Sequence, residues 1–151
     1  MRKIVDVALG EIRYREDPPN SNKTKYGEWF GLDGVPWCGI FVSWVYDQAG
    51  FPLGNIGFLK GFAGCQTAAS HFLKTGEVVD VPSPGDIVFF DWDGNGRYDH
   101  AGIVTWVESD HILTVEGNTS YKNQSNGGEV MSRVRQRALK MLFVHPRVLD
   151  V

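Results

Sequence analysis

One cysteine, Cys38, stands at the start of a predicted helix, where a thiol could act as a nucleophile. Pro36 suits the first turn of such a helix. Gly50, followed by Pro52, marks its end, so a helix is expected from Trp37 to Ala49. Free backbone N–H groups and the positive end of the helix dipole favour a thiolate there. Because most unpaired cysteines are inert core residues, a catalytic interpretation depends on partners elsewhere in the chain.

A thiol nucleophile needs a base to take up its proton and a third group to orient that base. His100 is the best placed of the four histidines, because it opens a predicted strand directly after a loop. The small residues Ala101 and Gly102 follow it and leave room for another element to approach. The next predicted strand ends in Glu116, with Asn118 two residues further along the same face. Glu116 alone would be interpreted as a surface carboxylate, whereas the combination points to cysteine-dependent acyl chemistry.

The elements that must position these residues are helices first and strands afterwards. Helices are expected at 3–13, 37–49 and 65–75, with a long surface loop at 15–36. Strands are expected at 87–90, 100–107, 111–116, 130–137 and 142–148. This order predicts an α+β fold in which N-terminal helices pack on an antiparallel β-sheet.

Composition limits the classes of protein that fit. A chain of 151 residues that is 42% hydrophobic and 13% aromatic predicts one ordered domain. A net charge of -3 gives no general attraction to nucleic acid or to an anionic membrane. Two cysteines make neither a disulfide framework nor a cysteine zinc site. Asp6 and Glu11 interrupt any signal peptide, so we expect a protein made in the cytoplasm without one.

Four sequence blocks carry a resemblance to a known family. They are WCGIFVSW at 37–44, PGDIVFF at 84–90, DHAGIV at 99–104 and EGNT at 116–119. Together, over roughly residues 1–148, they resemble the CHAP family, the cysteine- and histidine-dependent amidohydrolases and peptidases of phage endolysins and bacterial wall hydrolases. The resemblance implies a papain-like α+β fold and a single catalytic domain over 1–151. Its implied site comprises Cys38 as nucleophile, His100 as base, Glu116 as orienting group and Asn118 as an accessory polar residue.

The resemblance also implies a substrate, bacterial peptidoglycan. A family member would cut an amide bond, either between the sugar and the stem peptide or within the peptide and its cross-bridge. It would act on the cell wall, through phage-encoded lysis or as a domain of a larger secreted or virion protein, and would need no cofactor for the chemistry. Separately from the resemblance, we expect a monomer. The alternatives are a catalytically silent wall-binding or tail-associated module, and a thiol amidase or acyltransferase acting on a small molecule.

Aromatic residues precede the cysteine and are candidates for substrate contact. Tyr26, Trp29 and Phe30 lie in the predicted loop, where they could line a groove or form a satellite core. Tyr26 also falls where members of the resembled family often carry an aromatic residue. Trp37, beside the nucleophile, completes the candidate substrate-binding set of Tyr26, Trp29 and Trp37.

The loop before His100 has the opening of a calcium-binding loop. Its candidate ligands, at positions 1, 3, 5, 7 and 9, are Asp91, Asp93, Asn95, the Arg97 carbonyl and Asp99. Position 12 is Gly102 instead of a bidentate glutamate, so the pattern is incomplete. Calcium there would also fix His100, because Asp99 adjoins it. The alternative is a glycine-rich hairpin whose acids are solvated.

Other polar residues are expected to serve structure. Arg133, Arg135 and Arg137 alternate along a predicted strand, so they should share a solvated face, with a grip on acidic wall polymers as the alternative. Cys65 and His71 are expected to pack within their helix, because neither is predicted beside a polar constellation. His111 and His145 are expected to face solvent or to pack, which leaves His100 as the candidate base.

Overall fold

The computed structural model describes residues 2–124, 126–137 and 140–150. Its strands are β1 (Val78–Val79), β2 (Ile87–Phe90), β3 (His100–Val107), β4 (His111–Thr119), β5 (Glu129–Gln136) and β6 (Met141–Val144). They form a six-stranded antiparallel sheet in the order β1-β6-β2-β3-β4-β5. The helices are α1 (Arg2–Leu9), α2 (Lys25–Phe30), α3 (Cys38–Gln48), α4 (Cys65–Thr75) and the 3-10 helix η1 (Arg147–Asp150). The predicted α+β class is therefore confirmed.

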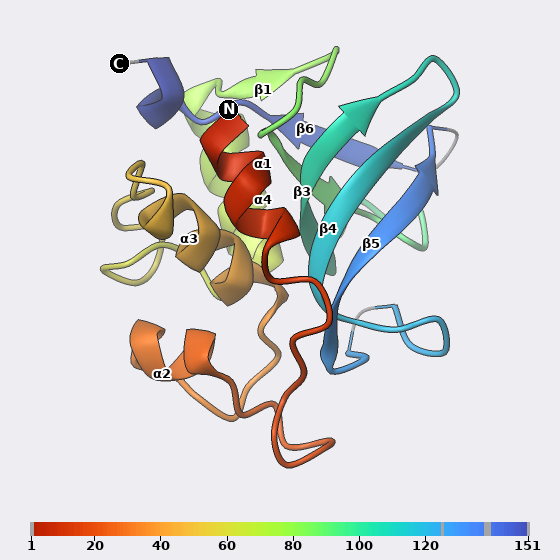
Figure 1. Ribbon diagram of the computed structural model, residues 1–151. Coiled ribbons are helices and arrows are strands. Elements are labelled where there is room, and N and C mark those ends of the chain that lie inside the picture. The colour runs from red at the N-terminus through yellow and green to blue at the C-terminus, as the bar shows by residue number, and fades with distance from the viewer. Residues whose placement is uncertain (1, 125, 138–139, 151) are drawn as a thin grey trace.

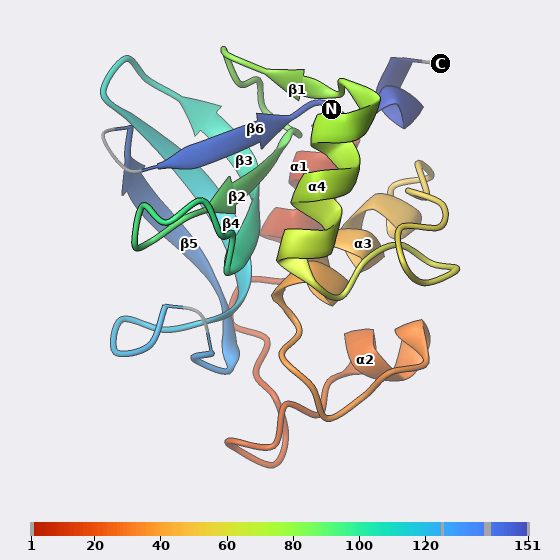
Figure 2. The ribbon, with the colours of Figure 1, turned by 180° about the vertical axis from the view of Figure 1, so that it is seen from behind.

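Three helices, α1, α3 and α4, cover one face of the sheet (Figures 1 and 2). Helix α3 packs against α1, α2 and strands β3 and β4, and most of its residues are buried. Such burial explains why its sequence is apolar on every side. In the described chain, no helix has the length and apolar character that crossing a membrane requires.

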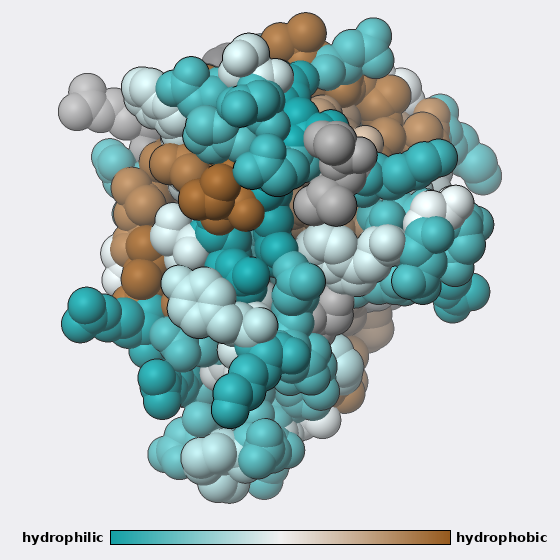
Figure 3. Space-filling model, turned by 90° about the vertical axis from the view of Figure 1, so that its right-hand side faces the viewer, coloured by the Kyte–Doolittle hydropathy of each residue, from teal (hydrophilic) through white to brown (hydrophobic). Residues whose placement is uncertain are grey.

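The two faces of the sheet carry separate clusters of buried side chains. Phe89 and its neighbours belong to the main core beneath the helices. Phe90 belongs to a smaller cluster on the opposite face. His100 pairs with Phe90 across the β2–β3 ladder, so its side chain also lies on that opposite face. The side of the molecule that carries the sheet is largely hydrophilic, with separate hydrophobic patches (Figure 3).

The segment expected to be a loop at 15–36 contains a helix, α2. The side chain of Thr24 caps it by accepting a hydrogen bond from the backbone N–H of Gly27 at 3.0 Å. Gly31, at φ 88°, ends it in the left-handed conformation that glycine adopts at low cost. The helix has only six residues, too few for its apolar spacing to be distinguished from a loop that contains aromatic residues.

Two further boundaries differ from expectation. Helix α1 ends at Leu9, because the chain turns there and Arg13, at φ 84°, donates its backbone N–H to the Val130 carbonyl at 2.9 Å. The last strand, β6, ends at Val144, and the chain after Pro146 forms η1. The two-residue strand β1, which pairs with β6, was not anticipated, because two residues are too few to show an alternation.

Candidate active site

Cys38 is the first residue of α3 and is only 4% exposed. The start of the helix is packed closely against another part of the chain. A Cβ atom on Gly39 would lie 2.8 Å from the Ala63 carbonyl and from the Phe62 ring. The Cys38 thiol is therefore held at a helix N-terminus by backbone that has little freedom to move.

His100 and Glu116 form a fully buried pair on β3 and β4. The imidazole Nε2 lies 2.8 Å from Glu116 Oε1, and neither side chain has exposed surface. Because the carboxylate only accepts, the proton of a neutral imidazole belongs on Nε2. The other nitrogen, Nδ1, is buried and forms no regular hydrogen bond in the described part of the chain. The pair therefore leaves Nδ1 to exchange a proton with a thiol.

The pKa values of the thiol and the imidazole move in opposite directions. A hydrogen bond from Cys65 is the largest cause that brings the pKa of Cys38 well below its usual range; burial opposes it, and nearby His100 adds to it. Burial alone would lower the pKa of His100, but the interactions with Cys38 and Glu116 raise it to about 9. Near neutral pH this geometry favours a thiolate beside an imidazolium.

Glu116 is held by more than His100. Arg135 donates Nε to Oε2 at 2.8 Å and Nη2 to Oε1 at 2.5 Å, and Thr114 donates its hydroxyl to Oε2 at 2.6 Å. Burial by itself raises the pKa of Glu116, yet Arg135 and His100 bring it down to about 2. The expectation that Arg135 lies on a solvated face is wrong, because its side chain is 4% exposed. The sequence could not show this contact, because it depends on the β4–β5 register, in which Arg135 pairs with Ile112 and reaches along the sheet to Glu116.

Cys65 also belongs to the site, contrary to the expectation that it only packs within its helix. It is the first residue of α4, and its Sγ lies 3.6 Å from Cys38 Sγ. The hydrogen bond to Cys38 and burial raise the pKa of Cys65 well above its usual range, so it remains a thiol that donates to the Cys38 thiolate. Sequence reasoning missed this contact because it depends on how two helices pack.

Asn118 is buried but makes its hydrogen bonds away from His100. Its Oδ1 accepts from the Gly128 backbone N–H at 3.0 Å, and its Nδ2 donates to Asn126 at 2.9 Å. The residue adopts φ 58°, a left-handed conformation that asparagine tolerates better than most residues. In this structure Asn118 braces the loop after β4, so a role beside the imidazole is a proposal that these hydrogen bonds do not support.

Two of the three aromatic candidates for substrate contact are core residues. Tyr26 and Trp37 have no exposed surface and stack with ring centroids 5.6 Å apart. The Trp37 indole donates to Glu16 Oε1 at 3.1 Å. Tyr26 and Trp37 are therefore part of the main core, whereas Trp29 is partly exposed and Lys60 Nζ lies 5.0 Å from the centre of its ring.

The loop at 91–99 is closed by its own hydrogen bonds. Asp91 is 4% exposed and accepts from the backbone N–H groups of Asn95 at 3.2 Å and Gly96 at 2.7 Å. Asn95 Oδ1 accepts from the Arg97 backbone N–H at 2.9 Å. No cluster of three or more acidic, histidine or cysteine side chains suited to a metal occurs among the described residues. The donor set as folded fits the hairpin alternative better than a calcium loop, since calcium would have to displace these bonds.

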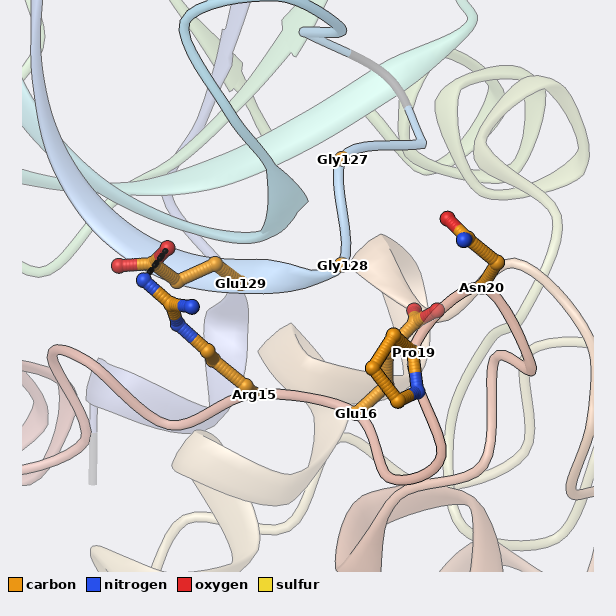
Figure 4. A pocket seen from close by; sticks show the side chains of 7 residues that line it. All are labelled: Arg15, Glu16, Pro19, Asn20, Gly127, Gly128 and Glu129. Atoms are coloured by element: carbon orange, nitrogen blue, oxygen red, sulfur yellow. Dashed lines mark ion pairs between the residues drawn. The ribbon is translucent and has the colours of Figure 1, made fainter.

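A cavity of about 170 Å³ lies beside the start of α3, between the 15–20 segment and the chain before β5 (Figure 4). Arg15 and Glu129 form an ion pair of 3.3 Å at one side of it. Glu16, which binds the indole of Trp37, and Gly128, which binds Asn118, also line it. Two of its lining residues thus contact Trp37, the residue before Cys38, and Asn118, two residues after Glu116.

Comparisons with known proteins agree with this geometry. The model of the family described as "CHAP domain" matches residues 30–118, more than half of the chain, so the chain belongs to the CHAP family. It is thus a CHAP amidase/peptidase domain, and membership suggests a cysteine-dependent amidohydrolase. The matched residues include Cys38, His100 and Glu116 but not Arg135. No match was found among curated proteins.

Two solved structures have the same fold. One is the crystal structure of Ly7917, with a TM-score of 0.54, and the other is Ly7917 with the hydrolyzing product of MDP, with a TM-score of 0.55. Each is 14% identical in sequence, and the match covers 96% of this chain. The chain spans 62% of the length of those solved chains. The match supports the CHAP, papain-like α+β architecture expected from the sequence.

Proposed function

We propose that this protein is a cysteine-dependent peptidoglycan hydrolase that cleaves an amide bond of the bacterial cell wall. The observation that carries the proposal is the convergence of Cys38, at a helix N-terminus, on a buried His100–Glu116 pair whose Nδ1 remains available. Membership of the CHAP family supports amide chemistry. The solved complex of Ly7917 with the hydrolyzing product of MDP, a peptidoglycan fragment, supports a wall-derived substrate.

The reaction follows from thiolate chemistry. The Cys38 thiolate attacks the amide carbonyl carbon, and the carbonyl π electrons move onto oxygen. The backbone N–H of Cys38, which has no intrahelical acceptor at the first position of α3, can hold the oxyanion with one further donor. When the tetrahedral intermediate collapses, the C–N bond breaks and protonated His100 gives its proton to the leaving amine.

The second half of the reaction restores the enzyme. A water molecule gives a proton to neutral His100 as its oxygen attacks the thioester carbon. The C–S bond then breaks, which releases a carboxylic acid product and regenerates the thiolate beside an imidazolium. Glu116 stays ionised and keeps the ring oriented through Nε2 during both half-reactions.

The proposed substrate side is the face around the cavity beside α3. Its lining includes an ion pair, a buried carboxylate and two adjacent backbone segments, which offer donors and acceptors to a peptide or glycan. Action on the cell wall, through phage-encoded host lysis or as a domain of a larger secreted or virion protein, is part of this proposal. A silent wall-binding module is disfavoured, because such a module needs no buried Cys-His-Glu arrangement.

The test is digestion of purified peptidoglycan followed by mass spectrometry of the released fragments. The wild-type protein should release fragments with one new amine and one new carboxylate, and their masses will identify the amide bond. Cys38→Ala is the matched control and should fold normally but release nothing. Fragments from both proteins, or from neither, would overturn the proposal. Cleavage of soluble amides without cleavage of peptidoglycan would favour the small-molecule alternative.

A further inference from the structure

Arg135 occupies an unusual position for a charged residue on an edge strand. Strand β5 lies at the end of the sheet order, and Val134 and Gln136, on either side of Arg135, are exposed. Arg135 itself is 4% exposed and faces the same side of the sheet as His100 and Glu116. A buried guanidinium costs free energy unless its charge and its donors are satisfied, so its partners indicate what it does.

The guanidinium of Arg135 and the side chains of His100 and Thr114 together occupy the hydrogen-bond acceptor sites of the Glu116 carboxylate. Oε1 receives hydrogen bonds from His100 Nε2 and Arg135 Nη2, while Oε2 receives them from Arg135 Nε and the Thr114 hydroxyl. A carboxylate has about four acceptor sites, so none remains for water or for a proton. Glu116 is therefore fixed both in orientation and as an acceptor.

Aromatic rings hold the other side of the guanidinium. Its centre lies 4.9 Å from the centre of the Trp92 ring and 5.2 Å from that of Phe90. Those two rings stack at 4.8 Å with 7° between their planes, and Trp92 also stacks on His100 at 6.0 Å and 27°. Arg135 and His100 therefore share an aromatic wall that keeps water from the carboxylate between them.

We propose that Arg135 is a positioning residue that locks Glu116 as an ionised acceptor, so that His100 can donate only through Nε2 and presents Nδ1 to Cys38. The proposal rests on the proposed function only in taking Cys38 and His100 as the reacting pair. The family model ends at residue 118, so this role belongs to a residue outside the matched region. Arginine suits it because its planar fork binds both carboxylate oxygens at once, which a lysine ammonium cannot do.

The test compares Arg135→Met and Arg135→Lys with the wild-type protein, using Arg137→Met as the matched control. Arg137 lies two residues along the chain and contacts the Glu108 carbonyl and the Phe143 ring instead of Glu116. Two readouts are needed: the rate of Cys38 alkylation by iodoacetamide across pH, and kcat with KM on purified peptidoglycan. Circular dichroism and Tm establish that each variant is folded.

The expected result is a change in the pH profile of Cys38 alkylation as well as a lower rate of peptidoglycan cleavage. Arg135→Met should lower kcat on the order of 100-fold with KM little changed. A displaced His100 impairs the alignment of the reacting groups but does not affect substrate binding. As pH falls, the Cys38 thiolate of this variant should disappear at a higher pH than in the wild type. The reason is that Glu116, without the guanidinium, takes up a proton at a higher pH. Arg135→Lys should fall between the two, and Arg137→Met should match the wild type.

The outcomes distinguish a positioning role of Arg135 from a purely structural role and from failure of the proposed function. Folded Arg135 variants with an unchanged alkylation profile would overturn it, and so would variants whose rates fall only in proportion to their folded fraction. Should Arg135→Met fail to fold, Arg135→Lys decides the matter, because it keeps the charge and loses only the fork. A shifted alkylation profile in a protein that digests no peptidoglycan would support the role of Arg135 and refute the proposed substrate.

Discussion

The sulfur atoms of Cys38 and Cys65 lie 3.6 Å apart, although the residues are 27 positions apart in the sequence. Each is the first residue of its helix, so the N-termini of α3 and α4 meet at the proposed nucleophile. Two positive dipole ends and an S–H donor therefore converge on one sulfur atom. The two thiols differ in their other neighbours: besides the hydrogen bond from Cys65, His100 lowers the pKa of Cys38, whereas the bond to Cys38, burial and Asp99 raise the pKa of Cys65.

The first prediction concerns this pair. Cys65→Ala removes the S–H donor to Cys38, so the pKa of Cys38 should rise and its alkylation by iodoacetamide should shift to higher pH. Cys65→Ser is the matched control, because a hydroxyl can still donate, and its shift should be smaller. In the wild-type protein near neutral pH, mass spectrometry should find one rapid adduct, on Cys38. An alkylation profile that Cys65→Ala leaves unchanged would contradict the assigned hydrogen bond.

The second prediction is the alkaline limit of activity. His100 must carry a proton to release the amine, and its pKa is raised to about 9. Peptidoglycan digestion should therefore persist through neutral pH and decline above about pH 9, with the decline following one ionisation. The measurement is kcat/KM against pH, accompanied by circular dichroism to exclude unfolding. A decline centred near pH 6.5, the ordinary value for histidine, would show that His100 gains no stabilisation from its partners.

The third prediction concerns stability in acid. The pKa of Glu116 in the folded protein is about 2, below the ordinary glutamate value of 4.5. A depressed carboxyl pKa stabilises the fold above pH 4.5, and this contribution is lost as pH falls towards 2. The shift corresponds to about 3 kcal/mol. Urea unfolding of the wild type should lose stability over this range, whereas Glu116→Gln, already less stable at pH 7, should lose less. Parallel losses in the two proteins would argue against a buried ionised Glu116.

The candidate catalytic residues could be chosen from the sequence because their signals are local. Cys38 follows a helix-start signal, His100 opens a predicted strand after a loop, and Glu116 ends the next predicted strand. Arg135 and Cys65 could not be assigned in this way, because their roles depend on strand register and on helix packing. The same limit applies to Tyr26 and Trp37, whose burial is set by tertiary contacts. Candidates for the reacting residues could be chosen from the sequence, whereas the residues that support them could be recognised only from the fold.

The fourth prediction tests the space around the carboxylate. A Cβ atom on Gly102 would lie 2.7 Å from Glu116 Cγ and 3.3 Å from the Val115 carbonyl. Gly102→Ala should therefore push Glu116 away from His100 and reduce kcat on the order of 100-fold, because the imidazole loses its orientation. Gly10→Ala is the matched control, since its nearest atoms are backbone oxygens at 3.5 Å. Equal activities for the two variants would show that the sheet accommodates the methyl group without moving Glu116.

The fifth prediction concerns calcium. Both carboxylate oxygens of Asp91 already accept backbone N–H groups, so the 91–99 loop should hold its shape through these bonds. Treatment with EGTA should leave Tm and peptidoglycan digestion unchanged, and Asp93→Ala should behave in the same way. Asp91→Ala should lower Tm with or without calcium, because it removes the acceptors that close the loop. Activity lost with EGTA and restored by calcium would instead establish that Asp91 exchanges its backbone partners for the metal.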